Sequence, residues 1–233
     1  MATANEIRKE VGDIFATAWE SREGRVVPDS ENLELGNDAV ELEGTVLYAD
    51  LADSTELVDN YKPAFAAEIY KAYLVTSCRI IRDRGGVITA FDGDRVMAVF
   101  LGDNKNSAAA RAALEIHWAV KDVINPAIKA QYTKTAFELQ QAVGIDTSPL
   151  FVAKTGIRGS NDLVWVGRAA NYAAKLSAYR NGSYSSFITE SVFKKLNDKS
   201  KYGGGTSRKV MWDKLMWEEM GITIYGSTWW WEI

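Results

Sequence analysis

Val46-Leu-Tyr-Ala-Asp-Leu51 is an apolar stretch that contains one acidic residue near its end, and it predicts a buried strand over residues 44–51. A second stretch, Ala90-Phe-Asp-Gly-Asp94, contains the Asp-Gly pair that is typical of a tight turn, here between strands at residues 87–91 and 95–100. The two stretches place Asp50 and Asp94 at the ends of neighbouring strands. Two carboxylates in that arrangement can hold a pair of divalent cations, which clamp the attacking and leaving oxygens of a phosphoryl transfer.

A third stretch with polar side chains in a helical pattern is Val166-Gly-Arg-Ala-Ala-Asn-Tyr-Ala-Ala-Lys175, within a helix predicted over residues 168–179. Asn171 and Lys175 are four residues apart, so they share one face of that helix. An amide and a cation on one face suit a ribose oxygen and a phosphate. Arg168 opens the helix, where it either reaches a base carbonyl or phosphate or lies on the surface.

The remaining periodicity predicts an α+β fold, a sheet with helices on its faces. Helices are expected over residues 5–19, 56–84 with a break at Pro63, 107–130 and 190–196, and strands over 137–145, 163–166 and 222–233. Ser54 or Thr55 is placed to cap the second helix. Residues 20–43 are polar and interrupted by Gly and Pro, so they are interpreted as a connector. The predicted organisation is an N-terminal helix and connector over residues 1–41 and a catalytic domain over residues 42–233.

The amino-acid composition limits the classes of partner that the chain is expected to bind. Its 233 residues are 47% hydrophobic, enough for a full core, and its net charge of −4 argues against a broad nucleic-acid or anionic-membrane surface. No apolar run approaches the ~20 residues of a membrane span, and the first ten residues lack the apolar stretch of a secretory signal. The single cysteine, Cys78, cannot form an internal disulfide and is interpreted as a small core residue. Together these features favour a location in the cytoplasm.

Two further features have structural interpretations. His117 is the single histidine and lies in an amphipathic segment, so a histidine-based mechanism has little to work with. Successive strand residues point to opposite faces, so Trp229, Trp230 and Trp231 cannot all enter one core. One or two of these indoles are expected to pack on a helix or on a dimer partner.

The three motifs, in this order over roughly residues 45–189, resemble the catalytic domain of the class III nucleotide cyclases. The resemblance implies a ferredoxin-like class III cyclase fold, with a mainly antiparallel sheet, that works as a head-to-tail homodimer with shared active sites. One chain would hold two Mg²⁺ or Mn²⁺ ions through Asp50, Asp94 and the backbone carbonyl of Leu51, and the other chain would supply Asn171 and Lys175. The loop of Ala52, Asp53, Ser54 and Thr55 resembles the one that lies under the triphosphate.

The departures from the family pattern are concentrated where the family reads the base. The family usually has arginine at the position of Lys175, and lysine keeps the charge but loses the planar fork. Ala90 and Val164 stand where adenylate and guanylate cyclases carry the polar side chains that read the purine edge. A site without those contacts loses much of its discrimination, so the chain has either lost its substrate or reads another base. Tyr48 shares the strand face of Asp50 and is either a base-pocket residue or a core tyrosine with an exposed hydroxyl.

Within the family, the closest resemblance is to the bacterial pyrimidine cyclases of Pycsar anti-phage defence. That resemblance implies conversion of UTP to 3′,5′-cyclic UMP and pyrophosphate, with the product acting on a separate effector; the residues leave CTP open as the substrate. Three alternatives remain from the residues alone. They are an adenylate cyclase that reads adenine through backbone groups, a catalytically silent cyclase-like binding or dimerisation module, and a different two-metal enzyme such as a nucleotide phosphohydrolase.

Overall fold

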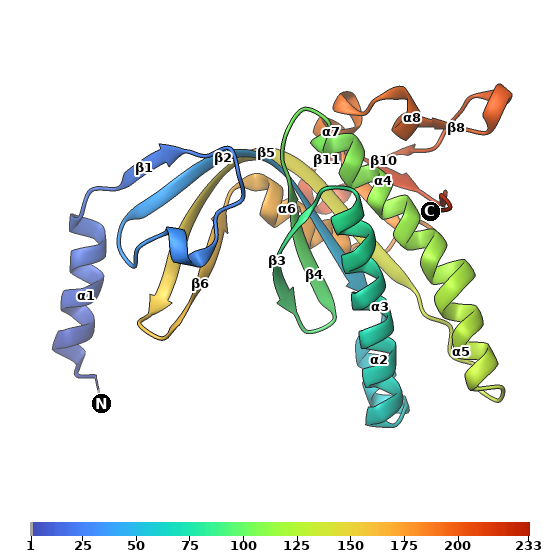
Figure 1. Ribbon diagram of the computed structural model, residues 1–233, viewed down its shortest axis with the longest axis horizontal. Coiled ribbons are helices and arrows are strands. Elements are labelled where there is room, and N and C mark those ends of the chain that lie inside the picture. The colour runs from blue at the N-terminus through green and yellow to red at the C-terminus, as the bar shows by residue number, and fades with distance from the viewer. Residues whose placement is uncertain (1) are drawn as a thin grey trace. The chain divides into compact units, whose positions relative to one another are not determined.

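The computed structural model describes residues 2–233, which form two compact units (Figure 1). The smaller unit comprises residues up to 43 together with residues 149–167, and the larger unit comprises residues 44–148 and 168–233. Two long strands, β2 (Asp38–Leu51) and β5 (Gln141–Ile157), contribute to both units. The domain boundary expected after residue 41 stays a prediction.

The larger unit is built on a sheet whose strands follow the order β10-β11-β7-β5-β2-β4-β3. Strands β5 and β7 are parallel, whereas the pairs β2/β4, β3/β4, β7/β11 and β10/β11 are antiparallel. The strands added to β2 and β5 are β3 (Val87–Asp92), β4 (Arg95–Phe100), β7 (Ser186–Thr189), β10 (Asp213–Trp217) and β11 (Ile222–Ser227). The expected Asp-Gly hairpin is therefore present as β3 and β4, and the mainly antiparallel α+β sheet is confirmed.

Helices cover both faces of this sheet because alternate residues of β5 point in opposite directions. Val143 and Ile145 belong to the core that includes residues of α3 and α4, whereas Ala142 packs in a second cluster with Leu176 of α6. The helices are α2 (Ser54–Asn60), α3 (Pro63–Asp83), α4 (Lys105–Trp118), α5 (Asn125–Gln131), α6 (Arg168–Ser177), α7 (Glu190–Lys195) and α8 (Asp198–Lys201). Among residues 2–233, no helix combines the length and the apolar character needed to cross a membrane.

Three expected elements differ from the structure. The strand expected over residues 137–145 begins only at Gln141 and continues to Ile157 as β5. The helix expected over residues 107–130 is divided into α4, a π-helical stretch Ala119–Ile124, and α5, which has proline in its first turn. The strand expected over residues 222–233 ends at Ser227. The tail after it bonds to α4 instead of a strand, since the Trp231 N–H donates to the Leu114 carbonyl at 3.1 Å.

The smaller unit gives the expected connector a structure of its own. It contains α1 (Ala4–Ala16), β1 (Glu20–Glu23), the 3₁₀ turn Ser30–Asn32 and β6 (Ser160–Val166). Strand β1 pairs in parallel with β2, which begins at Asp38, six residues before the expected strand, because Ala39, Val40 and Leu42 are buried. The apolar side of α1 is exposed, with Phe15 at 85% of its maximal accessibility.

A close approach between α6 and β5 fixes the helix that carries Asn171 and Lys175. Gly144 of β5 faces α6 so closely that an added Cβ would lie 2.2 Å from the Ala173 carbonyl oxygen and 2.4 Å from the Ser177 nitrogen. These are backbone atoms, which cannot rotate away as a flexible side chain would. Any residue other than glycine would therefore push the helix away from the sheet.

We expect Gly144→Ala to lower the free energy of unfolding by about 1–3 kcal/mol, the usual range for overpacking a filled core. Gly12→Ala is the matched control, because an added Cβ there meets nothing within 4 Å on α1 and alanine favours the helix. Thermal melts of both variants test this. An unchanged melting temperature for Gly144→Ala would contradict the close packing of α6 on β5.

Candidate active site

The pairing of three strands brings the two predicted carboxylates together. Asp50 is the penultimate residue of β2 and lies directly opposite Arg95, the first residue of β4. Asp94 precedes Arg95 in the β3–β4 turn, where Gly93 adopts a positive φ of 63°. Asp50 and Asp94 line one pocket of about 590 Å³, together with Leu51. The expected proximity of these three residues is present in the structure.

Burial gives Asp50 an unusual electrostatic position. Its side chain is 12% exposed, and burial followed by the charge of Asp94 raises its pKa to about 6. The nearest opposing charge is Arg180, whose Nη2 lies 3.8 Å from Asp50 Oδ2. The backbone carbonyl of Asp50 accepts a hydrogen bond of 3.2 Å from the buried Tyr73 hydroxyl. A buried carboxylate whose pKa is raised by burial and by a neighbouring acid lies in an environment that favours a bound cation.

The oxygen atoms present fit a divalent cation of the Mg²⁺ or Mn²⁺ type. The Asp50 and Asp94 carboxylates and the Leu51 carbonyl are hard oxygen donors. Among residues 2–233, no group of three or more histidine, cysteine, aspartate or glutamate side chains is placed to hold a metal. The donor set therefore suits ions that keep several ligands from water and from substrate phosphates, as Mg²⁺ does.

The loop after β2 supplies another wall of this pocket. Asp53, Ser54 and Thr55 line it, whereas Ala52 is buried behind it and donates its N–H to the Gln140 carbonyl at 2.9 Å. The N-cap of α2 is Asp53, which has a left-handed backbone with φ of 57°. The expected cap at Ser54 or Thr55 is wrong, because the chain turns one residue earlier and both residues lie inside the helix.

The two base-pocket candidates in the larger unit lie in one row across the sheet. Tyr48 of β2 and Ala90 of β3 both pair with Met97 of β4, so the three residues share a face. Asp50 and Arg95 form the next row on the same face. Burial raises the pKa of the half-buried Tyr48 hydroxyl. Tyr48 therefore brings a hydroxyl to the face that carries the metal-ligand candidate, and Ala90 adds no polar side-chain group to it.

Val164 lies in the smaller unit, on β6 opposite Ala153 of β5, and is 39% exposed. Its apolar side chain has no donor or acceptor, as the sequence indicates.

The third motif forms α6 as expected, but its residues lie apart from the carboxylate pocket. Asn171 and Lys175 are exposed on one face of the helix, and Lys175 Nζ lies 3.3 Å from Glu219 Oε1. Within the described chain, neither residue lines the pocket of Asp50 and Asp94. The chain thus presents two separate sets of functional groups.

Arg168 is held by a buried acid. Its Nε and Nη2 bond the two carboxylate oxygens of Asp146 at 2.9 and 3.1 Å, and Asp146 is fully buried. Nη2 also donates to the Thr147 carbonyl at 2.9 Å. These bonds fix the first turn of α6, so the structure shows that Arg168 anchors the helix. The Arg168 side chain is still 44% exposed.

Two arginines that line the carboxylate pocket were not predicted from the sequence. Arg95 and Arg180 both line the pocket of Asp50 and Asp94, and Arg95 is ion-paired with Asp92. Arg95 follows Asp94 directly in the sequence, and this position beside a predicted metal ligand could have indicated its place at the site. Arg180 comes from the loop after α6 and has no motif around it. Its place beside Asp50 depends on the tertiary fold.

Known proteins resemble the whole chain. No protein-family model matches it. It is 53% identical over 235 residues to a uridylate cyclase of Xanthomonas perforans and 51% identical over 235 residues to one of Burkholderia cepacia. Each alignment covers 100% of this chain and 100% of the relative. The chain belongs to the uridylate cyclase family.

Solved structures show the fold of this cyclase. The adenylyl cyclase CyaB from P. aeruginosa has a TM-score of 0.68 at 21% identity, covering 81% of this chain and 95% of that one. A guanylyl cyclase structure has a TM-score of 0.67 at 18% identity, covering 82% and 94%. These likenesses confirm the class III cyclase fold that the three motifs predicted, and together with the family they show a nucleotide cyclase.

We expect Asp50→Asn to stabilise the metal-free cyclase above pH 6. The pKa of Asp50 in the folded protein is raised from 3.8 to about 6. The contribution of Asp50 to the free energy of unfolding is therefore fully present below about pH 4 and is lost as the pH rises through 6. Because asparagine carries no charge at any pH, Asp50→Asn should raise the free energy of unfolding by roughly 1–3 kcal/mol above pH 6 and by almost nothing near pH 4. Asp59→Asn, at an exposed position on α2, is the control. Melting in EDTA at both pH values measures the difference, and a lower melting temperature for Asp50→Asn above pH 6 would contradict the assignment.

Proposed function

We propose that this cyclase converts UTP to 3′,5′-cyclic UMP and pyrophosphate. The observation that carries the proposal is the identity of 53% and 51%, over full length, to two relatives named uridylate cyclase. The base-pocket candidates also support it, through the resemblance. Ala90 lacks the hydrogen-bonding side chain that the resemblance associates with purine reading, and Tyr48 lies in its row with a hydroxyl. This row therefore lacks a polar contact that the resemblance associates with purine cyclases, and a pyrimidine substrate does not need it.

In the proposed reaction the ribose 3′ hydroxyl attacks the α-phosphorus of the same nucleotide. The new 3′ O–P bond forms as the bond from the α-phosphorus to the bridging oxygen of the β-phosphate breaks, and pyrophosphate leaves. The hydroxyl proton passes to Asp50 or to water. Two Mg²⁺ or Mn²⁺ ions held by Asp50, Asp94 and the Leu51 carbonyl would lower the pKa of that hydroxyl and offset phosphate charge.

The second set of groups positions the substrate. The Asn171 amide would orient the ribose, and the Lys175 ammonium would pair with the phosphates, exchanging its exposed Glu219 partner for a more highly charged one. The loop of Asp53, Ser54 and Thr55 would lie under the triphosphate at the wall of the carboxylate pocket. Arg95 and Arg180 are further cations at that pocket.

We propose a head-to-tail homodimer in which each active site takes Asp50 and Asp94 from one chain and Asn171 and Lys175 from the other. The support is that the two sets lie apart within one chain and that Asn171 and Lys175 are exposed. The isologous geometry of a two-fold dimer would then build two identical sites.

The biological role proposed is that of a cytoplasmic, second-messenger enzyme in anti-phage (Pycsar) defence, whose product acts on a separate effector. This rests on the resemblance of the three motifs to the pyrimidine cyclases of that system.

The nucleotide specificity is tested by incubating the cyclase with ATP, GTP, CTP and UTP separately in Mn²⁺ and identifying products by mass. We expect cyclic UMP from UTP, little product from the purines, and loss of product in Asp94→Asn. Cyclic AMP as the main product would select an adenylate cyclase, and release of phosphate without pyrophosphate would select a phosphohydrolase. Failure of every nucleotide would overturn the catalytic proposal in favour of a binding module.

The shared site is tested by mixing two inactive chains, Asp50→Ala and Lys175→Ala. Half of the dimers in an equal mixture are mixed and each has one intact site, so activity should recover to about a quarter of the natural level. A mixture of Asp50→Ala and Asp94→Ala damages the same set of groups and should stay inactive. Equal recovery in both mixtures, or none in the first despite mixed dimers by mass, would count against a site built from two chains.

A further inference from the structure

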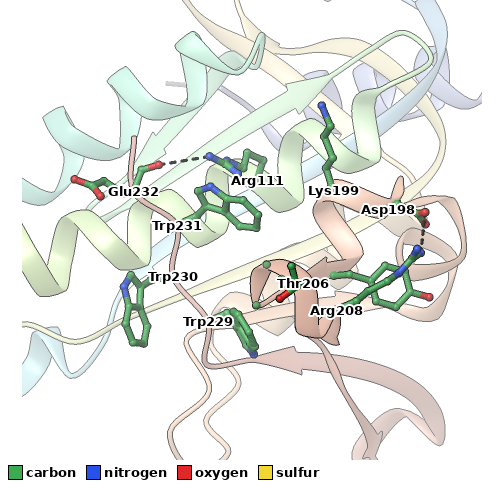
Figure 2. A pocket seen from close by; sticks show the side chains of 13 residues that line it. Arg111, Asp198, Lys199, Thr206, Arg208, Trp229, Trp230, Trp231 and Glu232 are labelled. Atoms are coloured by element: carbon green, nitrogen blue, oxygen red, sulfur yellow. Dashed lines mark hydrogen bonds and ion pairs between the residues drawn. The ribbon is translucent and has the colours of Figure 1, made fainter.

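The C-terminal tail forms one wall of a second pocket, of about 880 Å³, that the cyclase reaction does not use (Figure 2). The pocket lies within the larger unit, between α4, the segment around α8 and the short strand β8 (Tyr202–Gly203), and the three consecutive tryptophans. It shares no lining residue with the pocket of Asp50 and Asp94. Its volume lies within the usual range for small-molecule sites.

The tail is fixed, so the pocket is formed without a ligand. The Trp231 N–H donates to the Leu114 carbonyl at 3.1 Å, and His117 Nδ1 lies 2.9 Å from the Trp229 carbonyl oxygen, to which it donates. Burial lowers the pKa of His117, which suits this neutral structural role. Two ends of the tryptophan run are thus tied to one helix.

Each indole is supported from one side. The Arg111 guanidinium lies 4.0 Å from the Trp231 ring centre, and the Lys121 ammonium lies 3.3 Å from that of Trp230. Trp229 packs on Gly203, where an added Cβ would come within 2.7 Å of the ring. Supported indoles keep their orientation, and Trp230 remains 48% exposed. A flat ring that enters the pocket would therefore meet preformed aromatic surfaces.

The same pocket carries cations although the whole chain has a net charge of −4. Lys199 lines it, and among residues 2–233 its ammonium group takes part in no ion pair or hydrogen bond. Arg208 pairs with Asp198 at 2.8 Å and stays 59% exposed. Figure 2 shows Lys199 and Arg208 on the side opposite Trp230, with the Glu232 carboxylate directed away from them.

We propose that this pocket binds a nucleoside monophosphate, cyclic or linear. The base would stack on an indole, an interaction that tolerates any base because every base has a π-face. The phosphate would pair with the Lys199 ammonium and the exposed edge of Arg208. A neutral aromatic compound would leave the Lys199 ammonium without a partner, and an inorganic anion would leave the exposed Trp230 indole in water. A ring joined to an anion satisfies both.

The test is calorimetric titration of the full chain carrying Asp94→Asn, in EDTA, with 3′,5′-cyclic UMP, uridine 5′-monophosphate and adenosine 5′-monophosphate. We expect saturable binding at one site per chain for at least one of the three. Trp230→Ala and Lys199→Glu should each weaken it about tenfold or more. Trp19→Ala, at a site 50% exposed in the smaller unit, and Lys195→Glu, at an exposed position of α7, are matched controls that should leave binding unchanged.

A spectroscopic measurement separates lost binding from lost folding. In ¹⁵N-labelled protein the indole N–H signals of the tail should shift on titration while that of Trp19 stays fixed. Absence of binding at millimolar nucleotide, or binding that survives both pocket variants, would overturn the proposal. Because the titration is metal-free and uses a chain disabled at Asp94, its failure would leave the proposed cyclase reaction untouched.

Discussion

The register between β2 and β4 is the constraint on which the carboxylate pocket depends. Asp50 is paired with Arg95, so Asp94 follows at the adjacent turn and both carboxylates face one pocket. A slip of one residue would exchange the two faces of β2. Leu47, Ala49 and Leu51, which now pack in the core with α3 and α4, would then face away from it, and Asp50 would enter that core. The apolar alternation of this strand therefore fixes both the packing and the position of the acidic groups.

The same register places a destabilising charge in the protein. Asp50 is largely buried beside a second acid, and the raised pKa records the free energy that its ionisation requires. The fold supports the strand end in other ways, since the buried Tyr73 hydroxyl holds the Asp50 carbonyl and Arg180 lies near the carboxylate. The distance of 3.8 Å between Arg180 and the Asp50 carboxylate is longer than that of a close ion pair. The negative charge of Asp50 is therefore only partly neutralised by the protein, and a bound cation could supply the remaining positive charge.

The sequence predicted those parts of the fold whose signals are local. The Asp-Gly turn, the break at Pro63 and the Gly-x₃-Asn helix each appear where expected. The short strands β1, β7 and β10 lacked a local signal, because strands of four or five residues have too few positions to show an alternation. Their pairing also depends on neighbours that are distant in the sequence. The tryptophan tail has strong strand propensity, but Trp229 and Trp231 bond to α4 and to the Ser227 hydroxyl instead of to a neighbouring strand. Arg180 reaches Asp50 only through the tertiary fold.

The positions of the two sets of functional groups bear on how the cyclase would be controlled. Asn171 and Lys175 lie on a helix that is fixed twice to the sheet, by the contact over Gly144 and by the bond between Arg168 and the buried Asp146. Asp50 lies on a central strand of the same sheet. Because each set is attached to a rigid element, neither requires folding at the moment of catalysis. In the proposed dimer, the geometry between the sets would then be decided by how two chains associate, and a change in that association would alter activity without altering either chain's core.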